Sequence, residues 1–178
     1  MVNVQLQKPS GGTFEQRLQP GLCIGKCVDI TDAPAGQFGD NMYWWWEVYY
    51  TGTSAKDLIP ASFNEDGSIY RLRDMTSTKF GKGKTADKTA KSRVRVEALL
   101  KREIDDDEPL DGLLDQCVGK PALLYLVATE AGYLNIQLVQ PYKAGTLAPM
   151  PERPDPASDE LPFDGGTPAP SDDSDAPF

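Results

Sequence analysis

Residues 42–51 constrain the fold more than any other part of the chain, because they have the pattern of an aromatic strand. Six of the nine residues from Met42 to Tyr50 are aromatic, and all three tryptophans lie among them. Successive side chains of a strand point to opposite faces of its sheet. The alternation gives one set with Trp44, Trp46, Val48 and Tyr50, and a second set with Tyr43, Trp45, Glu47 and Tyr49.

A small β domain can bury one of these two sets in its core. Glu47 predicts that its own set faces outward, because an unpaired carboxylate is rarely buried. The alternative is that both sets are buried, one of them at an interface between copies. On an outward face, flat rings suit the stacking of nucleic-acid bases. We therefore expect stacking by the aromatic residues of the second set, Tyr43, Trp45 and Tyr49.

Further strand patterns surround the aromatic strand, at Leu22–Ile30, Ser68–Thr76, Leu123–Thr129 and Leu134–Val139. One helix is predicted between the third and fourth strands, where apolar residues recur at helical spacing: Val96, Leu99, Leu100 and Ile104. We expect Thr85 or Asp87 to cap its start and the acidic loop Asp105–Glu108 to end it. Basic residues occupy its other faces. Three strands, a helix and two strands are the order of a five-stranded oligonucleotide-binding (OB-fold) barrel, so we expect a mainly β domain over residues 1–143.

Residues 144–178 have the composition of a disordered tail. They hold eight of the fifteen prolines and only five large apolar residues, Leu147, Met150, Leu161, Phe163 and Phe178. Such a segment buries too little apolar surface to offset the entropy of ordering its backbone.

Charge is distributed in blocks. The chain has a net charge of −9, but residues 71–102 hold eleven Lys or Arg against three acids, while residues 103–115 hold seven acids and no base. The basic block suits phosphate binding. Arg71 and Arg73 share one face of their strand, and a Gly/Lys-rich loop and the helix follow. The candidate phosphate-binding and stacking residues of this block are Arg71, Arg73, Lys79, Phe80, Lys82, Lys84, Lys91 and Arg93.

Several classes of chemistry are disfavoured. The chain has no histidine, and its three cysteines, Cys23, Cys27 and Cys117, make a poor zinc site, so we expect buried, unpaired thiols and no metal or cofactor. The segment Gly81–Thr85 resembles a nucleotide-binding loop, but Thr78 stands where that motif requires glycine. No nucleophile–base arrangement is evident, so an enzyme is not expected. The alternative in another class is a metal-dependent nuclease that uses Asp105, Asp106 and Asp107.

The last residues are Ser171-Asp172-Asp173-Ser174-Asp175-Ala176-Pro177-Phe178. Acids followed by a terminal Pro-Phe resemble the tail of bacterial and phage single-stranded DNA-binding proteins. The resemblance implies that a partner protein is docked by Asp172, Asp173, Asp175, Pro177 and Phe178. An upstream segment, Asp159–Phe163, has the same order of acids and Pro-Phe. The folded part also looks like small phage-encoded OB-fold proteins of replication and recombination.

These observations lead us to expect a sequence-nonspecific single-stranded DNA-binding protein of DNA replication, recombination or repair. Its expected partners are single-stranded DNA, replication or recombination proteins held by the tail, and a second copy in a homodimer. The chain has neither a membrane-spanning apolar run nor a signal-peptide pattern, so a bacterial cytoplasmic location, with a phage or bacterial origin, is expected. A recombination mediator or strand-annealing protein, an RNA-binding relative and a protein-directed adaptor are the alternatives among binding proteins.

Overall fold

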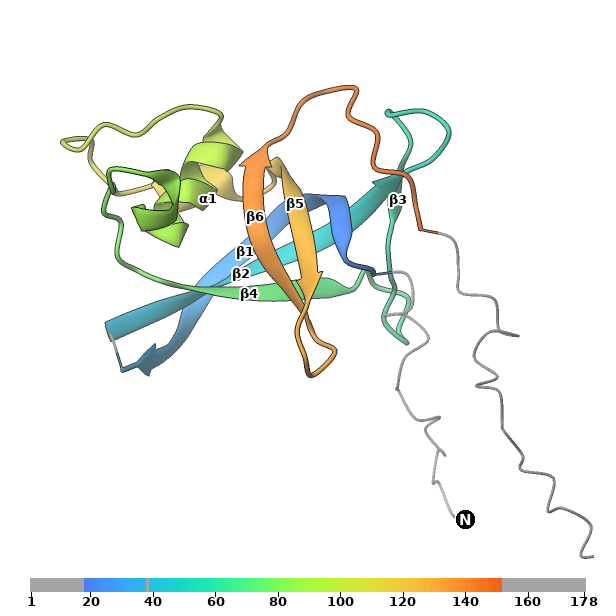
Figure 1. Cartoon of the computed structure of the whole chain (residues 1–178), viewed down its shortest axis with the longest axis horizontal. Helices are drawn as coiled ribbons and strands as arrows, with labels where there is room; N and C mark the ends of the chain where they lie inside the picture. The colour runs from blue at the N-terminus through green and yellow to red at the C-terminus, as the bar shows by residue number, and fades with distance from the viewer. Residues whose placement is uncertain (1–17, 38, 152–178) are drawn as a thin grey trace, which may run out of the picture.

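The computed structural model describes residues 18–37 and 39–151 and shows a mainly β domain (Figure 1). Its strands are β1 (Gly21–Gly36), β2 (Gly39–Thr51), β3 (Leu58–Pro60), β4 (Arg71–Ser77), β5 (Pro121–Ala128) and β6 (Leu134–Pro141). Its helices are the short 3-10 helix η2 (Ala86–Lys88), α1 (Lys91–Leu100) and α2 (Leu113–Cys117). In this part of the chain, no helix is both long and apolar enough to cross a membrane.

The strands form one antiparallel sheet in the order β3-β2-β1-β5-β6, and β4 pairs with β2. Because β1 occupies one edge of β2, β3 and β4 share the other edge, at residues 49–51 and 41–47 of β2. The sheet curves so that β5 and β6 cross in front of β1 and β2 (Figure 1). Among the described strands, no ladder joins β4 to β6, and the hydrogen-bonded sheet is open between them.

All five predicted strands are present, and the alternation along β2 is confirmed. Trp44, Trp46, Val48 and Tyr50 are buried, whereas the side chains between them are partly exposed. Two features differ from the prediction. β1 continues to Gly36 and makes a long hairpin with β2, and β3 is an additional strand of three residues that pairs with the end of β2.

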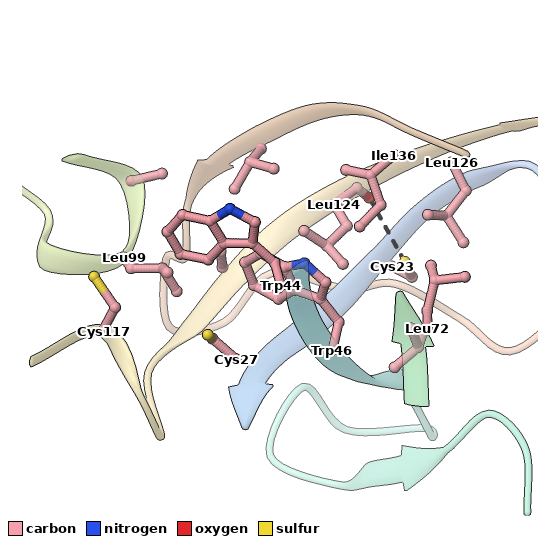
Figure 2. Packing of buried hydrophobic residues seen from close by; sticks show 14 of the residues in the cluster. Cys23, Cys27, Trp44, Trp46, Leu72, Leu99, Cys117, Leu124, Leu126 and Ile136 are labelled. Carbon is pink, nitrogen blue, oxygen red and sulfur yellow. Dashed lines mark hydrogen bonds between the residues drawn. The ribbon is translucent and has the colours of Figure 1, made fainter. Parts of the chain in front are cut away.

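The core lies between the two crossing parts of the sheet, around two tryptophans (Figure 2). The rings of Trp44 and Trp46 stack with centroids 6.2 Å apart, and the Trp44 indole N–H donates to the Thr76 hydroxyl at 2.9 Å. The three cysteines are buried and unpaired, as predicted. Burial raises the pKa of the Cys23 and Cys27 thiols to about 12 and that of Cys117 to about 11, so these thiols are unreactive at neutral pH.

Helix α1 is shorter than predicted, and its basic residues are placed differently. It begins after Ala90 without a side-chain cap, so capping by Thr85 or Asp87 was wrong. It ends at Leu100 with Lys101 as its C-cap, whose φ is 57°, and Ile104 is buried beyond the helix. Of the basic residues expected on its outer faces, Arg93 and Arg95 are buried. Arg95 pairs with Asp74 of β4 at 2.5 Å, which ties the helix to the sheet.

The packed part of the chain extends beyond the predicted boundary at residue 143. The Thr51 N–H donates to the Ala148 carbonyl at 2.7 Å, and the Ala148 N–H donates to the Thr51 hydroxyl at 2.9 Å. Ala148 is buried against the end of β2. A short return segment after β6 therefore belongs to the domain. The remainder of the predicted tail, residues 152–178, lies outside the described residues.

Candidate nucleic-acid interface

The outward faces of β2 and β4 bring the predicted aromatic and basic residues together. In the β2–β4 register, Tyr43 lies opposite Met75, Trp45 opposite Arg73, and Glu47 opposite Arg71. Arg71 and Arg73 are exposed, while Leu72 between them is buried. Alternation thus turns Leu72, Asp74 and Thr76 inward and gives β4 a cationic face beside the outward rings of β2.

The outward aromatic rings are held in defined orientations. Tyr43 and Trp45 meet edge to face, with centroids 6.1 Å apart and planes at 64°. The Trp45 indole N–H donates to the Thr31 hydroxyl at 2.9 Å, and the Arg73 guanidinium carbon lies 4.5 Å from the centre of the Tyr43 ring. Such preorganisation lowers the entropy cost of binding a ligand. An exposed ring beside a cation can contact a base and its phosphate together.

Tyr49 lies in the same outward row but is tied to a carboxylate. Its hydroxyl donates to Glu47 at 2.6 Å. Burial, with a further contribution from the hydrogen bond and charge of Glu47, raises the pKa of Tyr49 to about 12. The strand also places Tyr49 opposite Ile24 and Pro60, at the end of β2 away from Tyr43. Tyr49 therefore sits at the periphery of the Arg71–Arg73 surface.

A groove runs beside β4 and opens toward the β5–β6 hairpin. Its larger part, about 690 Å³, has Trp45, Arg71 and Arg73 on one side and hairpin residues from Ala128 and Gly132–Asn135 on the other. A second hollow of about 420 Å³ continues from it along Glu47, Asn64 and Ser68. Both parts share Trp45, Tyr70 and Arg71. We name this continuous hollow the β4 groove; it occupies the open side of the sheet between β4 and β6.

Tyr133 faces this groove from the hairpin and was not among the predicted residues. Its side chain is 73% exposed, although the hairpin backbone is fixed by hydrogen bonds between Thr129 and Tyr133 at 2.7 and 3.1 Å. The sequence signal was an aromatic residue directly after the Ala131-Gly132 turn. This places an exposed ring on a short, hydrogen-bonded turn, in the same groove as Arg71 and Arg73.

The predicted basic loop continues from the other end of β4. Lys79, Lys82, Lys84 and Lys91 are all exposed. The loop is shaped by hydrogen bonds from Ser92 to the Lys79 carbonyl, from Ala90 N–H to Gly81 at 2.9 Å, and from Gly83 N–H to Thr89 at 3.1 Å. A Cβ at position 83 would collide with the Lys88 backbone, so the loop requires glycine there. From Arg71 to Lys79 an extended chain spans roughly 26 Å, so the cations form a long path.

Two predicted residues do not belong to this surface, Phe80 and Arg93. Phe80 is half-buried and packs against the core, with the Arg93 guanidinium carbon 5.6 Å from its ring centre. Arg93 is 3% exposed and donates to Glu97, to Asp106 at 2.8 Å and to the Ile104 carbonyl. Sequence periodicity could not show the contacts with Ile104 and Asp106, because they join the helix to a loop that follows it. The guanidinium donors of Arg93 are bound within the fold, so we leave Arg93 out of the interface.

Support for the interface comes from the described residues alone. The predicted docking residues Asp172, Asp173, Asp175, Pro177 and Phe178, and the related segment Asp159–Phe163, lie outside them. No protein-family model matches the chain, and no curated protein is significantly similar to it in sequence.

Proposed function

We propose that this protein binds single-stranded DNA without strong sequence preference and performs no catalysis. The observation that carries the proposal is the β4 groove, in which outward Trp45 lies beside Arg71 and Arg73 while Tyr133 stands on the opposite wall. Rings that stack on bases and cations that contact phosphates are the two elements of non-specific single-strand binding. A duplex keeps its bases stacked inside the helix, so these rings favour single strands.

The strand order supports an OB-fold barrel as the scaffold of this activity. β1, β2 and β4, then α1, then β5 and β6 follow the order of five strands and a helix in that fold. The second and third strands and the loops of the two hairpins are where OB-folds bind oligonucleotides. In this chain the corresponding elements are β2, β4 and the β1–β2 and β5–β6 turns. The β4 groove is lined by residues of β2, β4 and the β5–β6 turn, which supports the proposal, whereas no described residue of the β1–β2 turn lines it.

The proposed site gives quantitative expectations. Each stacked base contributes about 1–3 kcal/mol. Five exposed cations follow the path, namely Arg71, Arg73, Lys79, Lys82 and Lys84. If each contacts one phosphate, the logarithm of the binding constant falls with the logarithm of salt concentration with a slope of about −3.5. Strong salt dependence and tolerance of base sequence are therefore expected together.

The tail completes the proposed role. Its acids and terminal Pro-Phe would dock replication, recombination or repair proteins, while its covalent attachment would raise their concentration near the DNA. Bacterial cytoplasm, where replication and repair expose single strands, is the proposed place of action. The tail would also compete with DNA for the basic path when no partner is bound, because its net charge is opposite to that of the path.

Fluorescence anisotropy tests the proposal by comparing the affinities for a fluorescein-labelled oligo-dT strand, a duplex and an RNA strand of equal length. We expect tight binding of the single DNA strand, weaker binding of the duplex, and an intact strand after incubation with Mg²⁺. Cleavage would favour a nuclease that uses the aspartates Asp105–Asp107, and tighter binding of RNA would redirect the assignment. No binding of any strand at low salt would overturn the proposal.

A further inference from the structure

β5 and β6 are unusual in this chain because they contain no charged residue. Their sequences are Pro-Ala-Leu-Leu-Tyr-Leu-Val-Ala and Leu-Asn-Ile-Gln-Leu-Val-Gln-Pro, whereas 25% of the whole chain is charged. The buried half of each strand needs apolar residues for the core. The outward half has no such need, so its lack of charge points to another constraint.

The outward half presents a row of large apolar side chains across three strands. Leu22 of β1 pairs with Tyr125 of β5, and Tyr125 pairs with Leu138 of β6. These three side chains are 40%, 45% and 45% exposed. Half-buried Leu123 and the exposed amides of Gln137 and Gln140 flank the row. We call these six residues the uncharged face.

The uncharged face is separate from the β4 groove. The groove is lined by the tip of the β5–β6 hairpin, at Ala128 and Gly132–Asn135, whereas the apolar row crosses the middle of both strands. β5 and β6 turn their other side to the core, where Leu124, Leu126 and Ile136 belong to the same buried cluster as Trp44 and Trp46 (Figure 2). Neither the core nor the proposed DNA path therefore accounts for the exposed row.

We propose that the uncharged face is the surface through which two copies of this chain associate about a two-fold axis. In such an interface the same patch meets itself, so it must be self-complementary. A patch bearing charges of one sign would repel its copy, which matters in a chain of net charge −9. Uncharged side chains avoid this repulsion, and an amide can pair with its own copy because it both donates and accepts hydrogen bonds. Depletion of charged residues is also a feature of interface cores.

The proposed dimer uses none of the residues that line the β4 groove, and it does not depend on DNA binding. Two separate paths in one particle would allow it to hold two strands, or two parts of one strand. The measurement of association therefore uses protein alone, so that a failure of DNA binding would not affect its outcome.

Sedimentation velocity of the full chain over about 1–100 μM tests the proposal. We expect a dimer for the unaltered protein, a monomer for Tyr125→Glu/Leu138→Glu, and a dimer for the matched control Leu110→Glu, which alters a loop residue that is 52% exposed. Leu138→Gln is the milder variant and should weaken association at least tenfold. Unchanged tryptophan emission from Trp44 and Trp46 establishes that each variant is folded.

Three results would overturn the proposal. The first is an unaltered chain that remains monomeric at all concentrations. The second is a double variant, or a Leu138→Gln variant, that associates as strongly as the control. The third result is a monomer that becomes a dimer only when residues 1–17 are deleted. That outcome would assign the face to the chain's own N-terminal segment, which enters the described structure four residues before Leu22.

Discussion

Replacing Arg71 and Arg73 together by alanine should reduce both the affinity for single-stranded DNA and its salt dependence. Both side chains are exposed on β4 and line the groove beside Trp45. Each cation that contacts a phosphate contributes about −0.7 to the slope of log K against log salt, so the double variant should change the slope from about −3.5 to about −2.1. If the two proteins bind DNA equally at about 1 M salt, this difference in slope makes the double variant bind about 25-fold more weakly at about 0.1 M.

The assay is anisotropy of labelled oligo-dT at several salt concentrations. Lys56→Ala/Lys120→Ala is the matched control, because both lysines are exposed and neither lines the β4 groove. This control should retain the slope of the unaltered protein, since it removes the same charge from other surfaces. Equal slopes for the two double variants would refute the assignment of phosphate contacts to β4, whatever the affinities.

Three further predictions concern stability, pH and the tail. Asp74→Ala leaves the buried Arg95 without its partner and should lower the free energy of unfolding by about 3–5 kcal/mol in urea titrations; a loss below about 1 kcal/mol would contradict a structural role for the pair. Stability should fall as pH rises from about 9 to 12, because the pKa values of the Cys23 thiol and the Tyr49 hydroxyl are raised in the folded protein and these groups lose their protons first in the unfolded chain. Urea midpoints measured across that range should show this fall, and Cys23→Ala should make it smaller. Deleting residues 152–178, which carry eight acids and one base, should tighten DNA binding most at low salt; unchanged anisotropy titrations would exclude competition by the tail.

The faces of β2 could be predicted from the sequence because strand alternation is a local property. Trp44 and Trp46 lie on the same face of the strand as Val48 and Tyr50, whereas Trp45 lies on the same face as the charged Glu47, which indicates the outward side. The structure buries the first set and leaves the second partly exposed. The same reasoning separated Arg71 and Arg73 from Leu72.

The roles of Arg93 and Arg95 could not be predicted in this way. Arg93 lies three residues before Val96 and Arg95 four residues before Leu99, so both fall on or beside the apolar stripe. Their charge alone favours solvent exposure. Each is instead buried against acids that lie 13 or 21 residues away in sequence, Asp106 and Asp74. A carboxylate supplied by another element changes a surface arginine into an internal one, and only the tertiary structure shows that partner.

Tyr133 and the β4 groove were missed for a similar reason. A tyrosine directly after a turn is a weak signal by itself, and its place in the β4 groove follows from the position of the β5–β6 hairpin across from β4. The boundary after residue 143 was also placed too early, because Ala148 is held by two hydrogen bonds to Thr51 that composition does not reveal.

Tryptophan fluorescence during titration with oligo-dT tests the central proposal most directly. Trp44 and Trp46 are buried, and among the three tryptophans Trp45 alone lies on the outward face of β2. Base stacking should therefore quench emission of the unaltered protein, while Trp45→Phe should keep the emission of the buried pair and lose most of the quenching. No quenching in the unaltered protein, or the same quenching in Trp45→Phe, would contradict DNA binding at this face.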